Sequence, residues 1–84
     1  MAVKLISIVI PVYNGEKYIG RCLESVFKNR IDIPFEVMVI DDGSTDNTAE
    51  VVRKFSSRYV RINKSGVAAA RNTGIREAKG EIVF

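Results

Sequence analysis

The chain has 84 residues, enough for one domain at most, and its 46% hydrophobic and 27% charged residues are typical of a folded globular protein. Its 13 Lys and Arg against 10 Asp and Glu give a net charge of +3, too small and too dispersed to indicate a nucleic-acid-binding surface. One cysteine, Cys22, and no histidine argue against an internal disulfide and against a zinc site.

The apolar runs are all far shorter than the roughly 18 residues that indicate a membrane-spanning helix. A strand-like pattern begins almost at the first residue, which argues against a signal peptide. We therefore expect a cytoplasmic protein, or one at the cytosolic face of a membrane system.

The first element expected is a strand over residues 5–10, an apolar run rich in β-branched residues and broken only by Ser7. Pro11 is expected to end the pairing of this strand, because proline has no N–H to donate. Apolar residues at helical spacing then predict a helix, and Cys22 lies on its buried stripe as a core residue. The stripe consists of Ile19, Cys22, Leu23, Val26 and Phe27.

A second strand is expected over residues 35–40, and it stops abruptly at two adjacent acids, Asp41 and Asp42. Gly43 follows and permits backbone conformations closed to other residues. Asp46 or Asn47 is a suitable N-cap for a short second helix. Its apolar stripe consists of Thr48, Val51, Val52 and Phe55.

A third strand is expected over residues 59–62, a third helix over 65–79 with Gly80 as its stop signal, and a fourth strand over 82–84. The third helix carries a stripe of small residues that would let it sit close to a sheet: Val67, Ala70, Gly74 and Ala78. Near-continuous apolar strands alternating with helices predict an α/β fold. We expect a Rossmann-like three-layer α/β/α half-domain with a parallel sheet in the order 3-2-1-4.

Phe84 is only the third residue of the expected fourth strand, so we expect the domain to be truncated within that strand. In the order 3-2-1-4 this strand lies at an edge of the sheet. An exposed edge strand with apolar side chains is a template for pairing. The sequence thus predicts a homodimer through residues 82–84.

Polar side chains follow the strands at the edge where ligands bind in open α/β sheets, outside the carboxyl ends of the strands. Tyr13 offers a flat face for a base. Asp41 and Asp42 suit hydrogen-bond donors, such as the N–H of a base or the hydroxyls of a ribose. Arg71, in the first turns of the third helix, has the forked donors that match a diphosphate. Together these groups indicate a nucleotide carried as a diphosphate.

Each of these residues also has a purely structural interpretation. The two acids could simply cap the second helix or accept bonds from backbone amides, and Tyr13 could be a rim residue without a ligand. Arg71 could pair with a nearby acid such as Glu50 or Glu77. Neither a G-x-x-x-x-G-K-[ST] loop nor a G-x-G-x-x-G turn after the first strand is present, which argues against P-loop enzymes and dinucleotide dehydrogenases.

Three segments together resemble the N-terminal half of family 2 glycosyltransferases of the GT-A fold. They are residues 7–16 (SIVIPVYNGE), 39–46 (VIDDGSTD) and 66–74 (GVAAARNTG). They occur in the family's order and with similar spacing. The resemblance covers essentially the whole chain, so residues 1–84 are expected to form the N-terminal nucleotide-sugar-binding part of a GT-A domain.

The resemblance implies an inverting enzyme that transfers a hexosyl group from a nucleotide-sugar, most often a UDP-sugar, to an acceptor. It implies that this half of the domain holds the nucleotide. It implies that Pro11, Val12 and Tyr13 line the base pocket, and that Asp42, with Asp41 beside it, accepts hydrogen bonds from the base or ribose. Arg71 would contact the base or the diphosphate, and Glu16 and Asn72 would be supporting contacts.

In the family an acidic motif after the fourth strand helps to bind Mg²⁺ or Mn²⁺, and a later acid is the general base. Neither element occurs within these 84 residues, so no catalytic residue is assigned and the isolated chain is expected to be inactive. A non-catalytic nucleotide-binding or self-assembly module with the same fold is the main alternative. A response-regulator-like domain is a third, although the lysine expected on a later strand is missing.

Overall fold

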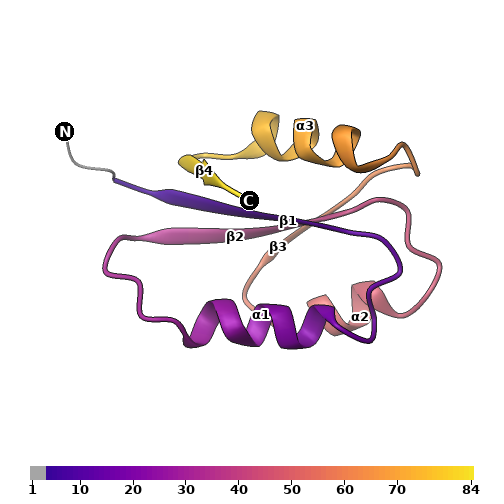
Figure 1. The fold of residues 1–84 in the computed structure, drawn as a ribbon, viewed down its shortest axis with the longest axis horizontal. Helices are drawn as coiled ribbons and strands as arrows, with labels where there is room; N and C mark the ends of the chain where they lie inside the picture. The colour runs from indigo at the N-terminus through magenta and orange to yellow at the C-terminus, as the bar shows by residue number, and fades with distance from the viewer. Residues whose placement is uncertain (1–3) are drawn as a thin grey trace.

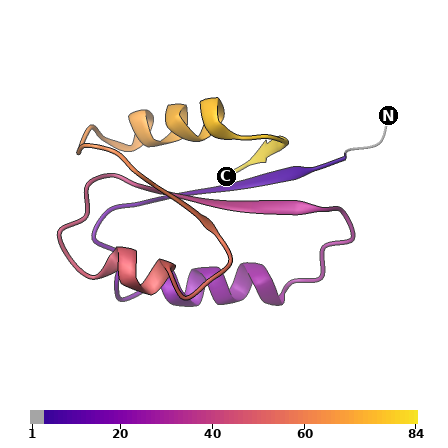
Figure 2. The same ribbon diagram turned by 180° about the vertical axis from the view of Figure 1, so that it is seen from behind.

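The computed structural model describes residues 4–84, in which strands and helices alternate along the chain (Figure 1). The elements are β1 (Ile6–Val12), α1 (Ile19–Lys28), β2 (Phe35–Asp41), α2 (Thr48–Val52), β3 (Arg58–Arg61), α3 (Val67–Glu77) and β4 (Glu81–Val83). The strands form one parallel sheet in the order β3-β2-β1-β4. Helices α1 and α2 cover one face and α3 covers the other (Figures 1 and 2). The predicted α/β fold and strand order are confirmed.

Strand β2 supplies side chains to both faces of the sheet, because successive residues of a strand point in opposite directions. Val37 and Val39 are buried in the core beneath α1 and α2, where they join Leu23. Met38 and Ile40 are buried in a second core beneath α3. Burial on both faces explains why the strands read as continuous apolar runs rather than as alternating ones.

Helix α3 lies very close to the sheet, as its small residues predict. A Cβ atom added to Gly74 would lie 2.4 Å from Cγ1 of Val9, a separation that no real contact allows. Ala70, one helical turn earlier, is fully buried against the same core. Small side chains at these positions therefore set the spacing between α3 and β1.

Strand β1 is longer than predicted, since it continues through Pro11 and pairs with β2 as far as Val12. The Asp42 N–H donates to the carbonyl oxygen of Val12 (2.9 Å), so Val12 directs its backbone groups toward β2. Pro11 therefore directs its backbone toward the opposite neighbour, β4, which pairs only with residues 6–8. Within residues 4–84 no neighbouring strand requires a donor at Pro11, so the expectation that Pro11 ends the pairing is wrong.

Helix α3 ends at Glu77, and Ala78 is already extended, so Gly80 is not its stop signal. A Cβ atom at Gly80 would lie 2.5 Å from the carbonyl oxygen of Leu5. The glycine is instead required where the chain enters β4 and comes close to the start of β1.

Ser7, the polar residue within β1, belongs to a network beneath this turn. Its hydroxyl donates to Oε2 of Glu36 (2.5 Å) and accepts from the Gly80 N–H (2.8 Å). The same carboxylate oxygen of Glu36 accepts from the Lys79 N–H (2.9 Å). These bonds, the Ser7 contact foremost, lower the pKa of Glu36. A fully buried serine thus ties the α3–β4 turn to the sheet.

Strand β4 pairs with β1 on one side, and within residues 4–84 no strand pairs with its other side. Val83 and Phe84 are about half exposed. The association through residues 82–84 stays a prediction. None of the helices in this part of the chain has the length and apolar character needed to cross a membrane.

Candidate functional site

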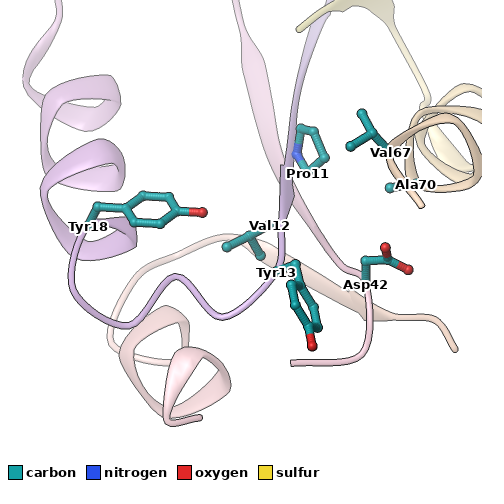
Figure 3. A pocket seen from close by; sticks show the side chains of 7 residues that line it. All are labelled: Pro11, Val12, Tyr13, Tyr18, Asp42, Val67 and Ala70. Carbon is teal, nitrogen blue, oxygen red and sulfur yellow. The ribbon is translucent and has the colours of Figure 1, made fainter. Parts of the chain in front are cut away.

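A cavity of about 250 Å³ lies at the carboxyl end of β1, on the edge of the sheet where a ligand is expected. Its walls are mostly apolar, with one carboxylate (Figure 3). Such a cavity suits a flat ring better than a whole nucleotide-sugar, because the pockets that hold drug-sized ligands have volumes of roughly 300–1,000 Å³. The residues that line it are Pro11, Val12, Tyr13, Tyr18, Asp42, Val67 and Ala70.

The loop after β1, which carries Tyr13, is held by the loop after β2. Asn14 adopts a left-handed conformation (φ 49°), and its Oδ1 accepts from the N–H groups of Thr45 (2.7 Å) and Asp46 (3.3 Å). In return, the Asn14 N–H donates to Oγ of Ser44 (2.8 Å). This reciprocal bonding fixes the backbone next to Tyr13 without using the Tyr13 side chain.

Asp46 adds a second connection between the same two loops. It accepts from the Thr48 N–H (3.0 Å) and hydroxyl, and from the Glu16 N–H (3.2 Å). Burial acts to raise the pKa of Asp46, but these hydrogen bonds outweigh it and lower that pKa. Asp46 thus caps α2, while the Asn47 side chain makes no capping bond. The Glu16 side chain is exposed and lies outside the cavity.

The predicted acid pair is divided between the two faces of the sheet. Asp42 lines the cavity and is 5% exposed. Its Oδ1 accepts from the Ser65 N–H (2.8 Å) and its Oδ2 from the Gly66 N–H (2.9 Å), which fixes the start of α3. Each carboxylate oxygen has a further lone pair, so Asp42 can still accept a hydrogen bond from a ligand.

Asp41 lies on the opposite side of the sheet and is fully buried. Its Oδ1 accepts from the Ser44 N–H (2.8 Å), and its Oδ2 accepts from the Tyr59 hydroxyl. The guanidinium of Arg61 is 3.7 Å from the same oxygen. Burial, followed by the bond to Asp41, raises the pKa of Tyr59. Asp41 therefore joins β2 to β3 and lies outside the cavity.

Arg71 and Asn72 are exposed on α3, and neither lines the cavity. The guanidinium carbon of Arg71 is 5.9 Å from the centroid of the Phe84 ring. The alternative that Arg71 pairs with Glu50 or Glu77 is not seen within residues 4–84, where Glu77 forms an ion pair with Arg58. The structure thus gathers Pro11, Val12, Tyr13 and Asp42, and leaves Glu16, Asp41, Arg71 and Asn72 outside.

Sequence reasoning missed Tyr18, which lines the cavity from the residue before α1 and is about half exposed. The available signal was a second aromatic side chain shortly after Tyr13, immediately before the helical stripe begins. Val67 and Ala70 were expected only as packing residues, yet they also form the wall on the α3 side (Figure 3).

The divalent cation implied by the resemblance does not fit the residues present. Within residues 4–84 no three His, Cys, Asp or Glu side chains are grouped so that they could hold a metal ion. Asp41 and Asp42, although adjacent, project toward opposite faces of the sheet and cannot ligate one ion together. We therefore assign no metal-dependent step to these residues.

Comparison with known proteins decides the family. The sequence model described as "Glycosyl transferase family 2" matches residues 7–84. This chain belongs to glycosyl transferase family 2. The relative "Glycosyltransferase GlyG" of Streptococcus pneumoniae is 41% identical in an alignment that covers 95% of this chain and 28% of that protein. This chain thus spans little more than a quarter of that relative's length.

Two solved structures have a similar fold over nearly all of this chain. The crystal structure of S. aureus TarS 1–349 in complex with UDP-GlcNAc has a TM-score of 0.83 and 37% identity, covering 94% of this chain and 25% of TarS 1–349. The mannosyltransferase PcManGT from Pyrobaculum calidifontis, in complex with GDP-Man and Mn²⁺, has a TM-score of 0.75 and 30% identity. That match covers 98% of this chain and 26% of the other.

Proposed function

We propose that this chain forms the nucleotide-binding part of the donor site in an inverting glycosyltransferase that uses a UDP-sugar. The observation that carries the proposal is the cavity at the end of β1, lined by Tyr13 and Asp42, in a chain whose fold matches a UDP-GlcNAc complex. Residues 1–84 would then be the N-terminal part of a GT-A domain.

In this proposal the base occupies the cavity and stacks on Tyr13, a residue that is 40% exposed. Stacking of a base on an aromatic side chain contributes about 1–3 kcal/mol. Pro11 and Val67 supply apolar walls on the other sides (Figure 3). The rigid loop around Asn14 would keep Tyr13 in place before the ligand arrives, which reduces the entropic cost of binding.

Asp42 would select the base or hold the ribose, because an ionised carboxylate accepts hydrogen bonds and donates none. Such a group can accept from a ring N–H, which uracil and guanine have at their pairing edge, or from the hydroxyls of the ribose. The two matched structures contain UDP-GlcNAc and GDP-Man. A GDP-sugar is therefore the main alternative donor to be tested against a UDP-sugar.

We further propose that the 84-residue polypeptide binds nucleotide without transferring sugar. Transfer in the family is expected to need a divalent cation, which offsets the charge of the leaving diphosphate, and an acidic general base. The residues of the cavity supply one carboxylate, and it is already bonded to two backbone N–H groups. Sugar-transfer turnover by the purified 84-residue chain, with UDP-GlcNAc and Mn²⁺, would contradict this proposal.

Calorimetric titration with UDP tests the proposed site. Tyr13→Ala should weaken UDP binding by about 1–3 kcal/mol, or roughly 5- to 150-fold, since the stacking face is lost. Tyr13→Phe is the matched control, because it keeps the ring and removes only the hydroxyl, and its affinity should stay close to that of the native chain. Equal affinities for all three proteins would place the nucleotide elsewhere.

A further inference from the structure

Lys64, in the loop between β3 and α3, lies over the ring of Tyr13. Its Nζ is 3.9 Å from the centroid of the Tyr13 ring, within the range of a cation–π interaction. Both side chains are exposed, so this interaction contributes only about 0.5–1 kcal/mol. The ammonium group is therefore easily displaced by a ligand that offers a better partner.

The backbone beside Lys64 is much more firmly held than its side chain. The next two residues, Ser65 and Gly66, donate their N–H groups to Asp42 (2.8 and 2.9 Å). From the other side, Gly43 approaches so closely that a Cβ atom there would lie 3.0 Å from the Lys64 nitrogen. Gly43 also has a positive φ of 80°, which favours glycine. The backbone of Lys64 is thus held in place, whereas its side chain is free to change partners.

A nucleoside diphosphate in the cavity would bring several negative charges close to the Asp42 carboxylate. A like charge nearby opposes binding unless a cation accompanies it. Arg71, which sequence reasoning assigned to the diphosphate, lies instead against Phe84. Lys64 is a cation that already contacts a residue of the cavity wall.

We infer that Lys64 is an affinity-determining residue that exchanges partners when the nucleotide binds. The base takes the place of the ammonium group on Tyr13, and the ammonium group pairs with a phosphate of the same nucleotide. This inference deepens the proposed function and rests on it. It requires Lys64 to favour phosphorylated ligands and to compete with ligands that have a base alone.

The exchange predicts opposite effects on two related ligands. Lys64→Gln removes the charge but keeps a polar chain of similar length. The variant should bind UDP about five- to tenfold more weakly, since one charge-assisted contact to phosphate is lost in a partly exposed site. It should bind uridine as well as the native chain or better, because the face of Tyr13 is no longer covered.

Two controls accompany that variant in calorimetric titrations with UDP and uridine at low and high salt. Lys28→Gln makes the same change of charge at the far end of α1 and should leave both affinities unchanged. Lys64→Arg keeps the cation and should keep most of the affinity for UDP. In the native chain, the ring-current shift of the Lys64 ε-CH₂ protons should disappear when UDP is added.

The outcomes separate the inference from the proposed function. If the native chain binds UDP and Lys64→Gln weakens UDP and uridine equally, Lys64 only positions Tyr13, and the exchange is overturned. Equal UDP affinity for native and variant chains, or an ε-CH₂ shift that persists in the complex, also overturns it. If the native chain binds neither UDP nor another nucleotide, the proposed function itself fails, and the exchange fails with it.

Discussion

Asp41 and Asp42 are consecutive in the sequence, yet their carboxylates serve opposite faces of the sheet. Asp41 points into the layer of α1 and α2, where it bonds to Ser44 and Tyr59, and Asp42 points toward α3 and the cavity. This is the ordinary alternation of side chains along a strand, continued for one residue past the end of β2. The two acids therefore have different partners, and their substitutions should have different effects.

Asp42→Asn should destabilise the fold by about 1–3 kcal/mol, because its two partners are backbone N–H groups and an amide nitrogen cannot accept from either. Asp41→Asn should cost less, below about 1 kcal/mol, because the Tyr59 hydroxyl can turn and accept from the new amide. Urea denaturation of the two variants measures the difference. A larger loss for Asp41→Asn would mean that the bonding described for these acids is wrong.

The same two substitutions also distinguish an effect on stability from an effect on nucleotide binding. Asp42→Asn should weaken UDP binding, whereas Asp41→Asn should leave the affinity of the folded protein within about threefold, since Asp41 does not line the cavity. Titrations well below each variant's unfolding temperature check this. A strong loss of affinity in Asp41→Asn alone would restore Asp41 as a ligand-binding residue.

Gly74→Ala should destabilise the chain by about 1–3 kcal/mol through overpacking, despite the better helix propensity of alanine. The added methyl group would fall 2.4 Å from Cγ1 of Val9, and α3 would have to move away from β1. Thermal unfolding measures the loss. Val9→Ala in the same chain should recover part of it, and a double-mutant cycle without coupling between the two positions would rule out this contact as the cause.

The network around Ser7 should make stability depend on pH through Glu36. Its pKa is lowered below the ordinary value of 4.5 in the folded chain, chiefly by the bond from Ser7 and then by the Lys79 N–H. The stabilisation is therefore complete above about pH 4.5 and is lost as the pH falls through the folded-state pKa. The difference in urea midpoint between the native chain and Glu36→Gln should shrink between pH 6 and pH 3. A difference that stays constant would exclude this contribution.

Self-association through β4 is a separate prediction. Within residues 4–84 it is an edge strand, and its Val83 and the following Phe84 are about half exposed. Sedimentation or light scattering at high micromolar concentration should show a dimer that Val83→Lys reduces, because a charge at an edge opposes pairing. A monomer in both proteins would count against the prediction.

The order of the strands and the placing of the cavity could be predicted from the sequence, because they follow from local patterns. Continuous apolar runs such as that of β2 indicate strands buried on both faces, and alternation with helices indicates a parallel sheet. Tyr13 and Asp42 follow strands whose carboxyl ends share one edge. Their convergence needs only the topology, not the detailed packing.

What the sequence could not show depends on tertiary contacts. The tolerance of Pro11 within β1 depends on how short β4 is, and the role of Gly80 depends on its approach to Leu5. The position of Lys64 over Tyr13 depends on a loop that Asp42 holds from another strand. Arg71 was assigned by its chemistry and by the family resemblance, and neither indicates that its side chain lies against Phe84.

We expect the cavity at the end of β1 to bind a nucleotide. Titration of the ¹⁵N-labelled chain with UDP, GDP and ADP, followed through amide chemical shifts, tests it most directly. UDP should produce saturable shifts at Tyr13, Asp42 and Val67, and should leave the signal of the distant Lys28 unchanged. Saturable shifts confined to residues outside the cavity, or no shifts with any of the three nucleotides, would contradict it.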